Sequence, residues 1–279
     1  MIPHRKTLIP HRKIFLLLVA LCVMLPAFQS GAEPLKIVTG TSLIDDIVRD
    51  LTEGRAQTVV LVPGSSCPGH DALKTSDFVF AAGADLFLVH AFQQNSPQLA
   101  GMLQSVQNRP LVVLRSKGNW LVPEAQKQAV RDIAAALEAA CPDLAPLIGE
   151  RAKARLGKID QAGAECAEKL AAVRGRGIVC AAMQAEFLRW AGLEVMESYN
   201  RAEEMTPKDV ALLIDRLRGR PVAGVVDNYQ SGAAAGLPLA LELKVPHLVL
   251  SNFPGSAEDT PDYFTLLRGN VARLIRLGG

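Results

Sequence analysis

Two runs of alternating strands and helices, separated by a long helical segment, constrain the fold of this chain most strongly. Short apolar runs such as 57–62 and 85–90 are each followed by a segment that favours a helix. Near-continuous apolar runs between helices are typical of parallel strands that are covered on both faces. Between residues 123 and 173 the pattern is helical with few breaks. We therefore predict an α/β protein with two Rossmann-like α/β lobes, joined by a long rigid helix, and a ligand cleft between the lobes.

The expected elements follow from the same patterns. Before the helical middle we expect strands at 35–40, 57–62, 85–90 and 110–114, and helices at 42–51 and 75–84. After it we expect strands at 178–182, 193–196, 222–226 and 247–250, and helices at 183–191, from 206, at 233–243 and at 262–277. The predicted domains are a signal peptide at 1–32, an N-terminal lobe at 33–142, a linking helix at 143–174 and a C-terminal lobe at 175–279.

The first 32 residues have the features of a cleavable secretory signal peptide. Basic residues precede an apolar run at 14–25, and small residues at 30–32 provide a cleavage site. A membrane anchor and lipid attachment at Cys22 are the alternatives, although the run is short for a membrane span. Loss of this segment removes four cations and no acid, which changes the net charge from +2 to −2. The mature chain thus has no basic excess for nucleic acid, and we expect it in the periplasm or another extracytoplasmic space.

The loop after the second expected strand carries two types of metal ligand. Cys67 and His70 stand at C-x-x-H spacing in a loop rich in Pro and Gly, at the strand end where open α/β sheets present their ligands. A thiolate and an imidazole both bind zinc well, but a tetrahedral site needs further donors from the second lobe. Cys180 is the first candidate for such a donor. A disulfide between Cys67 and Cys180 across the cleft is the alternative, because secretion favours oxidation.

Polar side chains also follow the other expected strands. Asp227 opens the cluster Asp-Asn-Tyr-Gln-Ser-Gly and is the second-lobe carboxylate that we expect to bind metal, with helix capping as its alternative role. We expect five further residues to line the cleft: His90, Asn119, Gln184, Asn228 and Asn252. A structural role is the alternative for His90, and Met183 is expected to pack in the core. Cys141 and Cys166 are expected to form a structural disulfide or to be buried separately.

Five segments, in this order, carry a resemblance to a known family. They are Ile37-Val-Thr-Gly-Thr-Ser-Leu-Ile-Asp-Asp-Ile-Val48, Leu61-Val-Pro-Gly64, Ala84-Asp-Leu-Phe-Leu-Val89, Asn119-Trp-Leu-Val-Pro123 and Tyr263-Phe-Thr-Leu-Leu-Arg-Gly-Asn-Val271. Together they resemble the metal-binding extracytoplasmic solute-binding proteins of ABC transporters, the receptors for zinc and manganese. The resemblance covers almost the whole chain after the signal peptide.

This resemblance implies a metal held by three histidines and one acid, with two ligands from each lobe. His70, together with Cys67, retains the first position in this chain. The second position falls on Gly118 or Asn119, the third within 180–184, and the fourth near Ser251 and Asn252. The resemblance therefore implies a divergent member of the family with a rebuilt site.

The predicted function is that of the receptor component of an ABC importer. It would capture a divalent transition metal, zinc first and manganese, nickel or cobalt otherwise, and pass it as a monomer to a membrane permease. The chain lacks the His-Glu-x-x-His and Gly-x-Ser-x-Gly motifs and a Gly-rich phosphate loop, so we do not expect an enzyme. The alternatives are a secreted metal chaperone or adhesion-type module, a receptor for a metal chelate or other small solute, and a metal-dependent hydrolase.

Overall fold

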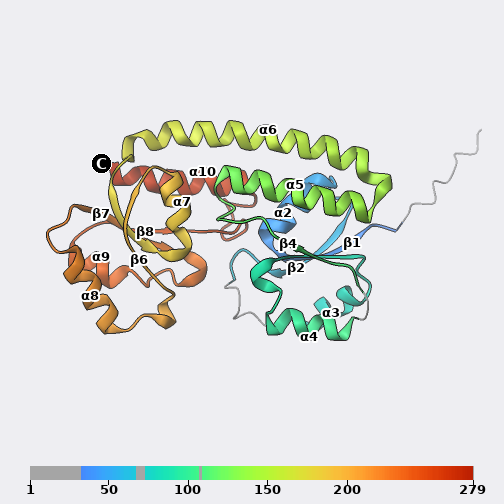
Figure 1. Cartoon of the computed structure of the whole chain (residues 1–279), viewed down its shortest axis with the longest axis horizontal. Helices are drawn as coiled ribbons and strands as arrows, with labels where there is room; N and C mark the ends of the chain where they lie inside the picture. The colour runs from blue at the N-terminus through green and yellow to red at the C-terminus, as the bar shows by residue number, and fades with distance from the viewer. Residues whose placement is uncertain (1–32, 67–72, 107–108, 279) are drawn as a thin grey trace, which may run out of the picture. The chain divides into compact units, whose positions relative to one another are not determined.

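Two parallel sheets and a long helix organise the protein. The computed structural model describes residues 33–66, 73–106 and 109–278, and within it Pro34–Gly279 form one compact unit. Each sheet has four strands. The strands of one sheet precede the helical middle in the sequence, and those of the other sheet follow it (Figure 1). The predicted class, two α/β lobes joined by a long helix, is confirmed.

The first lobe has the sheet order β2-β1-β3-β4, in which every pair is parallel. Its strands are β1 (Lys36–Thr41), β2 (Gln57–Val62), β3 (Leu86–His90) and β4 (Leu111–Leu114). Its helices are α2 (Ser42–Leu51), α3 (Thr75–Ala82) and α4 (Pro97–Ser105), with the short 3-10 helix η1 (Ala91–Gln93) after β3. All five residues of β3 are buried, as expected for a strand in the middle of a covered sheet.

The middle of the chain forms a helical hairpin. It consists of α5 (Pro123–Ala140), the 3-10 turn η2 (Pro142–Leu144) and α6 (Ala145–Leu170), which continues into η3 (Ala171–Val173). Pro142 cannot continue a helix, so α5 ends before it. At 1.5 Å per residue α6 is about 39 Å long. It packs against α2 and α5 of the first half and against α10 at the end of the chain, so one helix spans both lobes (Figure 1).

The second lobe repeats the parallel arrangement with the order β6-β5-β7-β8. Its strands are β5 (Gly177–Ala181), β6 (Glu194–Tyr199), β7 (Val222–Asn228) and β8 (His247–Leu250). Its α-helices are α7 (Ala185–Trp190), α8 (Pro207–Leu217), α9 (Leu237–Leu243) and α10 (Tyr263–Leu274). Short 3-10 helices stand at η4 (Ala182–Gln184), η5 (Ala202–Glu204), η6 (Tyr229–Ser231) and η7 (Ile275–Gly278).

A buried polar joint ties α6 to both lobes. The guanidinium of Arg155, with 2% of its side chain exposed, bonds to Asp46 and Asp50 of α2. The Asp46 carboxylate also accepts a hydrogen bond of 3.3 Å from the backbone N–H of Tyr263, the first residue of α10. The Tyr263 hydroxyl in turn donates to the carbonyl of Leu121, just before α5. Asp46 therefore connects helices of both lobes at one point.

Three details differ from the sequence predictions. Helix α4 was not predicted, and the segment predicted as a helix at 233–243 becomes helical only at Leu237. Cys141, Cys166 and Cys180 are free thiols, so of the two alternatives for Cys141 and Cys166 the disulfide is not formed; Cys166 is buried, whereas Cys141 is only partly buried. Among the described residues, none of the helices combines the length and the apolar character that crossing a membrane requires.

Candidate functional site

Three loops from the ends of strands meet where the lobes face one another. Asn119 lies in the β4–α5 loop of the first lobe, Met183 in η4 after β5, and Asn252 directly after β8. The Asn119 Nδ2 donates to Asn252 Oδ1 over 3.1 Å and lies 3.0 Å from the Met183 carbonyl oxygen. Asn252 Nδ2 is 3.3 Å from the same carbonyl. We call these three residues the amide junction. They fall at the second, third and fourth ligand positions that the resemblance implies.

Gln230 forms a second connection between the lobes. Its Nε2 donates to the carbonyl of Gly64 in the first lobe over 2.8 Å and to Ser251 Oγ over 2.7 Å. Its Oε1 accepts from the backbone N–H of Asn252 over 3.1 Å. Gln230 is 6% exposed, and its carboxamide makes good hydrogen bonds with both of its polar atoms. It therefore fixes the end of β2 against the end of β8.

Two glycines allow the lobes to approach closely. A Cβ on Gly64 would lie 2.0 Å from the carbonyl oxygen of Pro254, and a Cβ on Gly118 would lie 2.5 Å from Glu186 Oε1. Gly118 also has φ of +88°, which a residue with a side chain rarely adopts. Beside it, the N–H of Asn119 donates to Glu186 Oε2 over 2.7 Å. The first lobe thus contacts the second lobe directly at both Gly64 and Gly118.

The two strongest metal candidates from the sequence, Cys67 and His70, lie outside the described residues. Their loop departs from the end of β2, and its last described residues, Gly64 to Ser66, adjoin the second lobe through the Gln230 bond. Their role therefore stays a prediction.

Cys180 and Asp227 are both fully buried in the second lobe, and the structure does not bring them together. Cys180 pairs with Val226, so its side chain points to the opposite face of the sheet from that of Asp227. Burial raises the pKa of the Cys180 thiol to about 12, which disfavours the thiolate that binds metal.

The Asp227 carboxylate is occupied by other protein groups. Its Oδ1 accepts from the Tyr199 hydroxyl over 2.7 Å, its Oδ2 accepts from the N–H of Gly236 over 2.9 Å, and His247 Nε2 lies 2.6 Å from Oδ2. Burial, together with the charge and hydrogen bond of Asp227, raises the pKa of Tyr199. In this arrangement Asp227 orders the start of α9 rather than facing the amide junction.

Four of the five residues expected to line the cleft divide into two groups. Asn119 and Asn252 belong to the amide junction and are partly exposed. Gln184 and Asn228 are buried inside the second lobe, where Gln184 Nε2 donates to Asn228 Oδ1 over 3.1 Å. The Met183 side chain is 50% exposed, so its expected core packing is wrong, and its carbonyl is the group that enters the junction.

His90 is held inside the first lobe. Only 8% of the residue is exposed, and its Nε2 lies 2.8 Å from the Thr41 hydroxyl. Its ring packs against Trp120 and Phe92, with centroid distances of 4.3 and 5.0 Å. Burial lowers the pKa of His90 to about 3. These contacts match the structural role that the sequence left open for His90.

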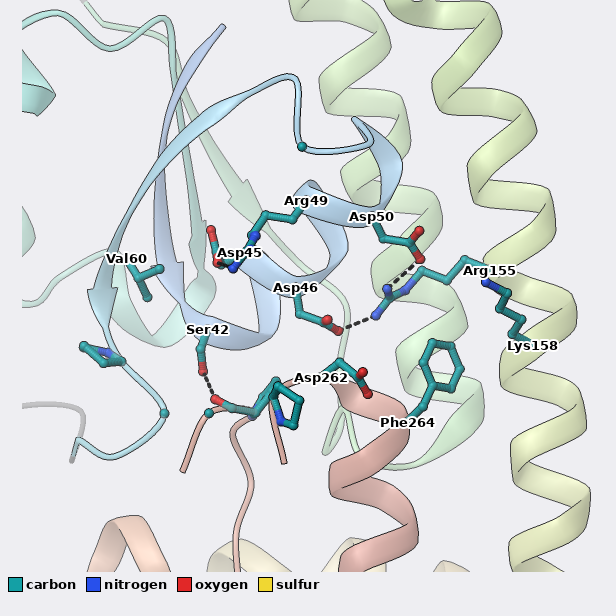
Figure 2. A pocket seen from close by; sticks show the side chains of 16 residues that line it. Ser42, Asp45, Asp46, Arg49, Asp50, Val60, Arg155, Lys158, Asp262 and Phe264 are labelled. Carbon is teal, nitrogen blue, oxygen red and sulfur yellow. Dashed lines mark hydrogen bonds and ion pairs between the residues drawn. The ribbon is translucent and has the colours of Figure 1, made fainter. Parts of the chain in front are cut away.

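A groove of about 810 Å³ lies between α2, α6 and the start of α10 (Figure 2). The first lobe contributes α2 and the end of β2, the second lobe contributes Pro254 and the start of α10, and α6 contributes Arg155 and Lys158. Figure 2 shows Arg155 directed at Asp46 and Asp50, and Ser42 donating to the Pro254 carbonyl over 2.8 Å. Much of the charge in this groove is therefore paired within the protein.

The described donors at the amide junction are neutral. Carboxamide and carbonyl oxygens suit hard cations and make weak ligands for a bare transition metal. Over residues 33–66, 73–106 and 109–278, no group of three or more His, Cys, Asp or Glu side chains is arranged to hold a metal ion.

Gln230 is a functional residue that the sequence analysis did not predict, although it lies in a segment that drew attention. It lies in the polar cluster after β7, from which Asp227 was selected because it carries a charge. The burial of Asp227 and the inter-lobe contact of Gln230 depend on the order of the strands, which the sequence pattern does not reveal.

Comparisons with known proteins agree with this architecture. The family model of the periplasmic zinc-uptake complex component A matches residues 37–276. A crystal structure of ZnuA is similar with a TM-score of 0.75 and 17% identity, covering 88% of this chain and 99% of that chain. A periplasmic metal-binding protein from Candidatus Liberibacter asiaticus gives a TM-score of 0.73 and 14% identity, covering 88% of this chain and 100% of that chain.

The same Liberibacter protein has also been solved with manganese bound, with a TM-score of 0.72, 14% identity and coverage of 87% of this chain and 98% of that chain. No curated protein matches. The similar structures show the shared fold, whereas the family match extends over nearly all of the chain after residue 36. By that match, this chain belongs to the family of the periplasmic zinc-uptake component ZnuA.

Proposed function

We propose that this protein is the extracytoplasmic receptor of an ABC importer and captures a divalent transition metal between its lobes. The observation that carries the proposal is the amide junction. Asn119, Met183 and Asn252 come from three separate strand ends and both lobes, yet they meet within hydrogen-bond distance. They meet at the positions where the family resemblance expects ligands, beside the stem of the Cys67–His70 loop. Family membership supports the same role.

Zinc is the cargo that the predicted donors favour. Cys67 and His70 would supply a thiolate and an imidazole from the first lobe, a pair that zinc binds readily. Cys180 and Asp227 remain the proposed second-lobe donors. Both are fully buried and Asp227 is hydrogen bonded, so their use would require the second-lobe strand ends to rearrange. Manganese, nickel and cobalt are the other cargo candidates.

A metal chelate or hydrated ion is the second candidate cargo. The specific observation in its favour is the neutral character of the amide junction, which offers carboxamide and carbonyl groups instead of charged ligands. Such groups recognise a ligand shell by hydrogen bonds. This candidate keeps the receptor function and changes only the form of the cargo.

The proposed setting follows from the same role. The receptor would act in the periplasm as a monomer, deliver its cargo to a membrane permease and catalyse no reaction. Lobe motion would be modest because α6 packs against elements of both lobes. Binding should weaken below about pH 6, where imidazole is protonated and thiolate is scarce.

Equilibrium dialysis of the reduced mature chain, followed by elemental analysis, tests the proposal. We expect submicromolar binding of one of zinc, manganese, nickel, cobalt or copper. Absence of such binding for all five ions would reject the bare-metal receptor. Dialysis against the same ions with a small chelator, such as histidine, would then separate the second candidate from the first.

A further inference from the structure

Several hydrogen bonds between the lobes join uncharged groups of the protein. Asn119 Nδ2 bonds to Asn252 Oδ1 and the Met183 carbonyl, and Gln230 Nε2 bonds to the Gly64 carbonyl. Each of these bonds joins the first lobe to the second. A neutral bond keeps its strength without an ion, so this contact does not require bound cargo.

The Asn119 side chain is held in the orientation that these bonds need. Its Oδ1 accepts a hydrogen bond of 2.9 Å from the backbone N–H of Leu121 in its own loop. This local bond fixes the carboxamide, which leaves Nδ2 directed at the second lobe. The backbone N–H of Asn119 donates to Glu186 over 2.7 Å, also in the second lobe. Because the group is preorganised, less conformational entropy is lost when the lobes meet.

The two lobes also approach each other closely on both flanks of the amide junction. Gly118, next to Asn119, would place a Cβ 2.5 Å from a carboxylate oxygen of Glu186. On the other flank, a Cβ on Gly64 would lie 2.0 Å from the Pro254 carbonyl oxygen, and Ser42 donates to that same oxygen. The lobes are therefore already at their contact distance in this arrangement.

We infer that the Asn119–Asn252 pair is an ion-independent latch, which holds the two lobes in contact before cargo binds. Asn119 and Asn252 are positioning residues in this account. Cargo binding then leaves the distance between the lobes unchanged, whatever the cargo is. This inference goes beyond the receptor function and does not depend on which ion is bound.

Residue-resolved amide hydrogen exchange of the mature chain, freed of metal with a chelator, tests the latch. The reporter is the Asn119 N–H, whose acceptor Glu186 belongs to the other lobe. We expect this N–H to be protected without metal, and its exchange rate to change less than about twofold when zinc is added. Asn252→Ala should raise its exchange rate about tenfold, as expected for the loss of a hydrogen bond of ordinary strength.

Two further variants separate a latch from a general loss of stability. Asn228→Ala removes two hydrogen bonds within the second lobe, one of 3.1 Å from Gln184 and one of 2.9 Å to Ser231. Because neither bond reaches the first lobe, the Asn119 N–H should remain protected. Asn252→Asp keeps an oxygen as acceptor for Asn119 Nδ2 and should restore protection relative to Asn252→Ala. The inference is overturned if the Asn119 N–H is unprotected in the metal-free protein, or if Asn252→Ala leaves its exchange unchanged. Protection in the metal-free protein and the effect of Asn252→Ala are both measured without zinc, so failure of the receptor proposal would be seen separately.

Discussion

Arg155 of α6 donates a hydrogen bond of 2.8 Å to the Asp50 carboxylate of α2, and only 2% of the Arg155 side chain is exposed. The same guanidinium bonds to Asp46 and lies 5.3 Å from the centre of the Phe264 ring. Burial of Asp50 opposes its ionisation, but hydrogen bonds from Arg151 and Arg155 outweigh this effect and lower its pKa. The linking helix is thus fixed to the first lobe through paired buried charges.

Replacing Arg155 with Ala should destabilise the protein strongly. The change leaves Asp46 and Asp50 without their buried partner, which typically costs about 3–5 kcal/mol. Arg151→Ala is the matched control, because Arg151 also pairs with Asp50 but is 31% exposed. Exposed pairs contribute about 0–1 kcal/mol. Urea unfolding of both variants measures the difference, and equal losses would show that burial of Arg155 has no special importance.

Stability should fall in mild acid because of His90. The pKa of His90 is lowered to about 3 in the folded protein, whereas an unfolded histidine has a pKa of about 6.5. Between these values the unfolded chain binds the extra proton, so this contribution is complete above about pH 6.5 and declines as the pH falls toward 3. From pH 7 to 4.5 it amounts to about 2 kcal/mol.

His90→Gln provides the comparison, because glutamine retains hydrogen-bonding groups near Thr41 but does not titrate. Urea unfolding at pH 7 and pH 4.5 should show a smaller acid loss for the variant than for the parent. An equal loss in both proteins would place the acid sensitivity elsewhere.

Replacing the two asparagines of the amide junction with metal-binding side chains should strengthen zinc binding. Asn119 and Asn252 are within hydrogen-bond distance across the lobes, and the resemblance implies a histidine and an acid at these positions. The double variant Asn119→His/Asn252→Asp should therefore bind zinc at least about tenfold more tightly than the parent, since imidazole and carboxylate are better ligands than amides. Competition with a zinc-sensitive dye measures this affinity, and the single variants serve as controls. Unchanged affinity in the double variant would separate the junction from the metal site.

A side chain on Gly64 should force the lobes apart. Gly64→Ala places a Cβ where the Pro254 carbonyl oxygen now lies, so the radius of gyration in small-angle X-ray scattering should increase. Gly157→Ala in α6 is the control, because nothing lies within 4 Å of its Cβ, and it should favour the helix by about 0.5–1 kcal/mol. Identical scattering from both variants would mean that Gly64 does not set the contact distance.

The regular elements could be read from the sequence because their signals are local. Strands β2 and β8 occupy the predicted residues 57–62 and 247–250, and α2 begins and ends as predicted. Helix α4 was missed although Ser96 caps it and Pro97 occupies its first turn, a recognisable start signal. The apolar pattern of α4 is weak, so Ser96 and Pro97 are the clearest indication in the sequence that a helix begins there.

The amide junction could not be derived from the sequence because it depends on contacts that are distant along the chain. Asn119 and Asn252 are 133 residues apart, and the packing of one lobe against the other brings the end of β4 to the ends of β5 and β8. The sequence did select Asn119 and Asn252 as cleft residues. Asp227 is favoured as a ligand by its carboxylate and its position after a strand, but the sequence does not show that Tyr199 and His247 bond to it.

Zinc binding to the reduced mature chain, compared with His70→Ala, tests the central claim most directly. Gly157→Ala on α6 is the control, because nothing lies within 4 Å of its Cβ and Gly157 is none of the proposed donors. Equilibrium dialysis should find one zinc ion per parent chain with submicromolar affinity, at least about tenfold weaker binding for His70→Ala, and parent-like binding for Gly157→Ala. A parent chain that binds no zinc, or a His70→Ala variant with undiminished affinity, would contradict a zinc site at the lobe junction.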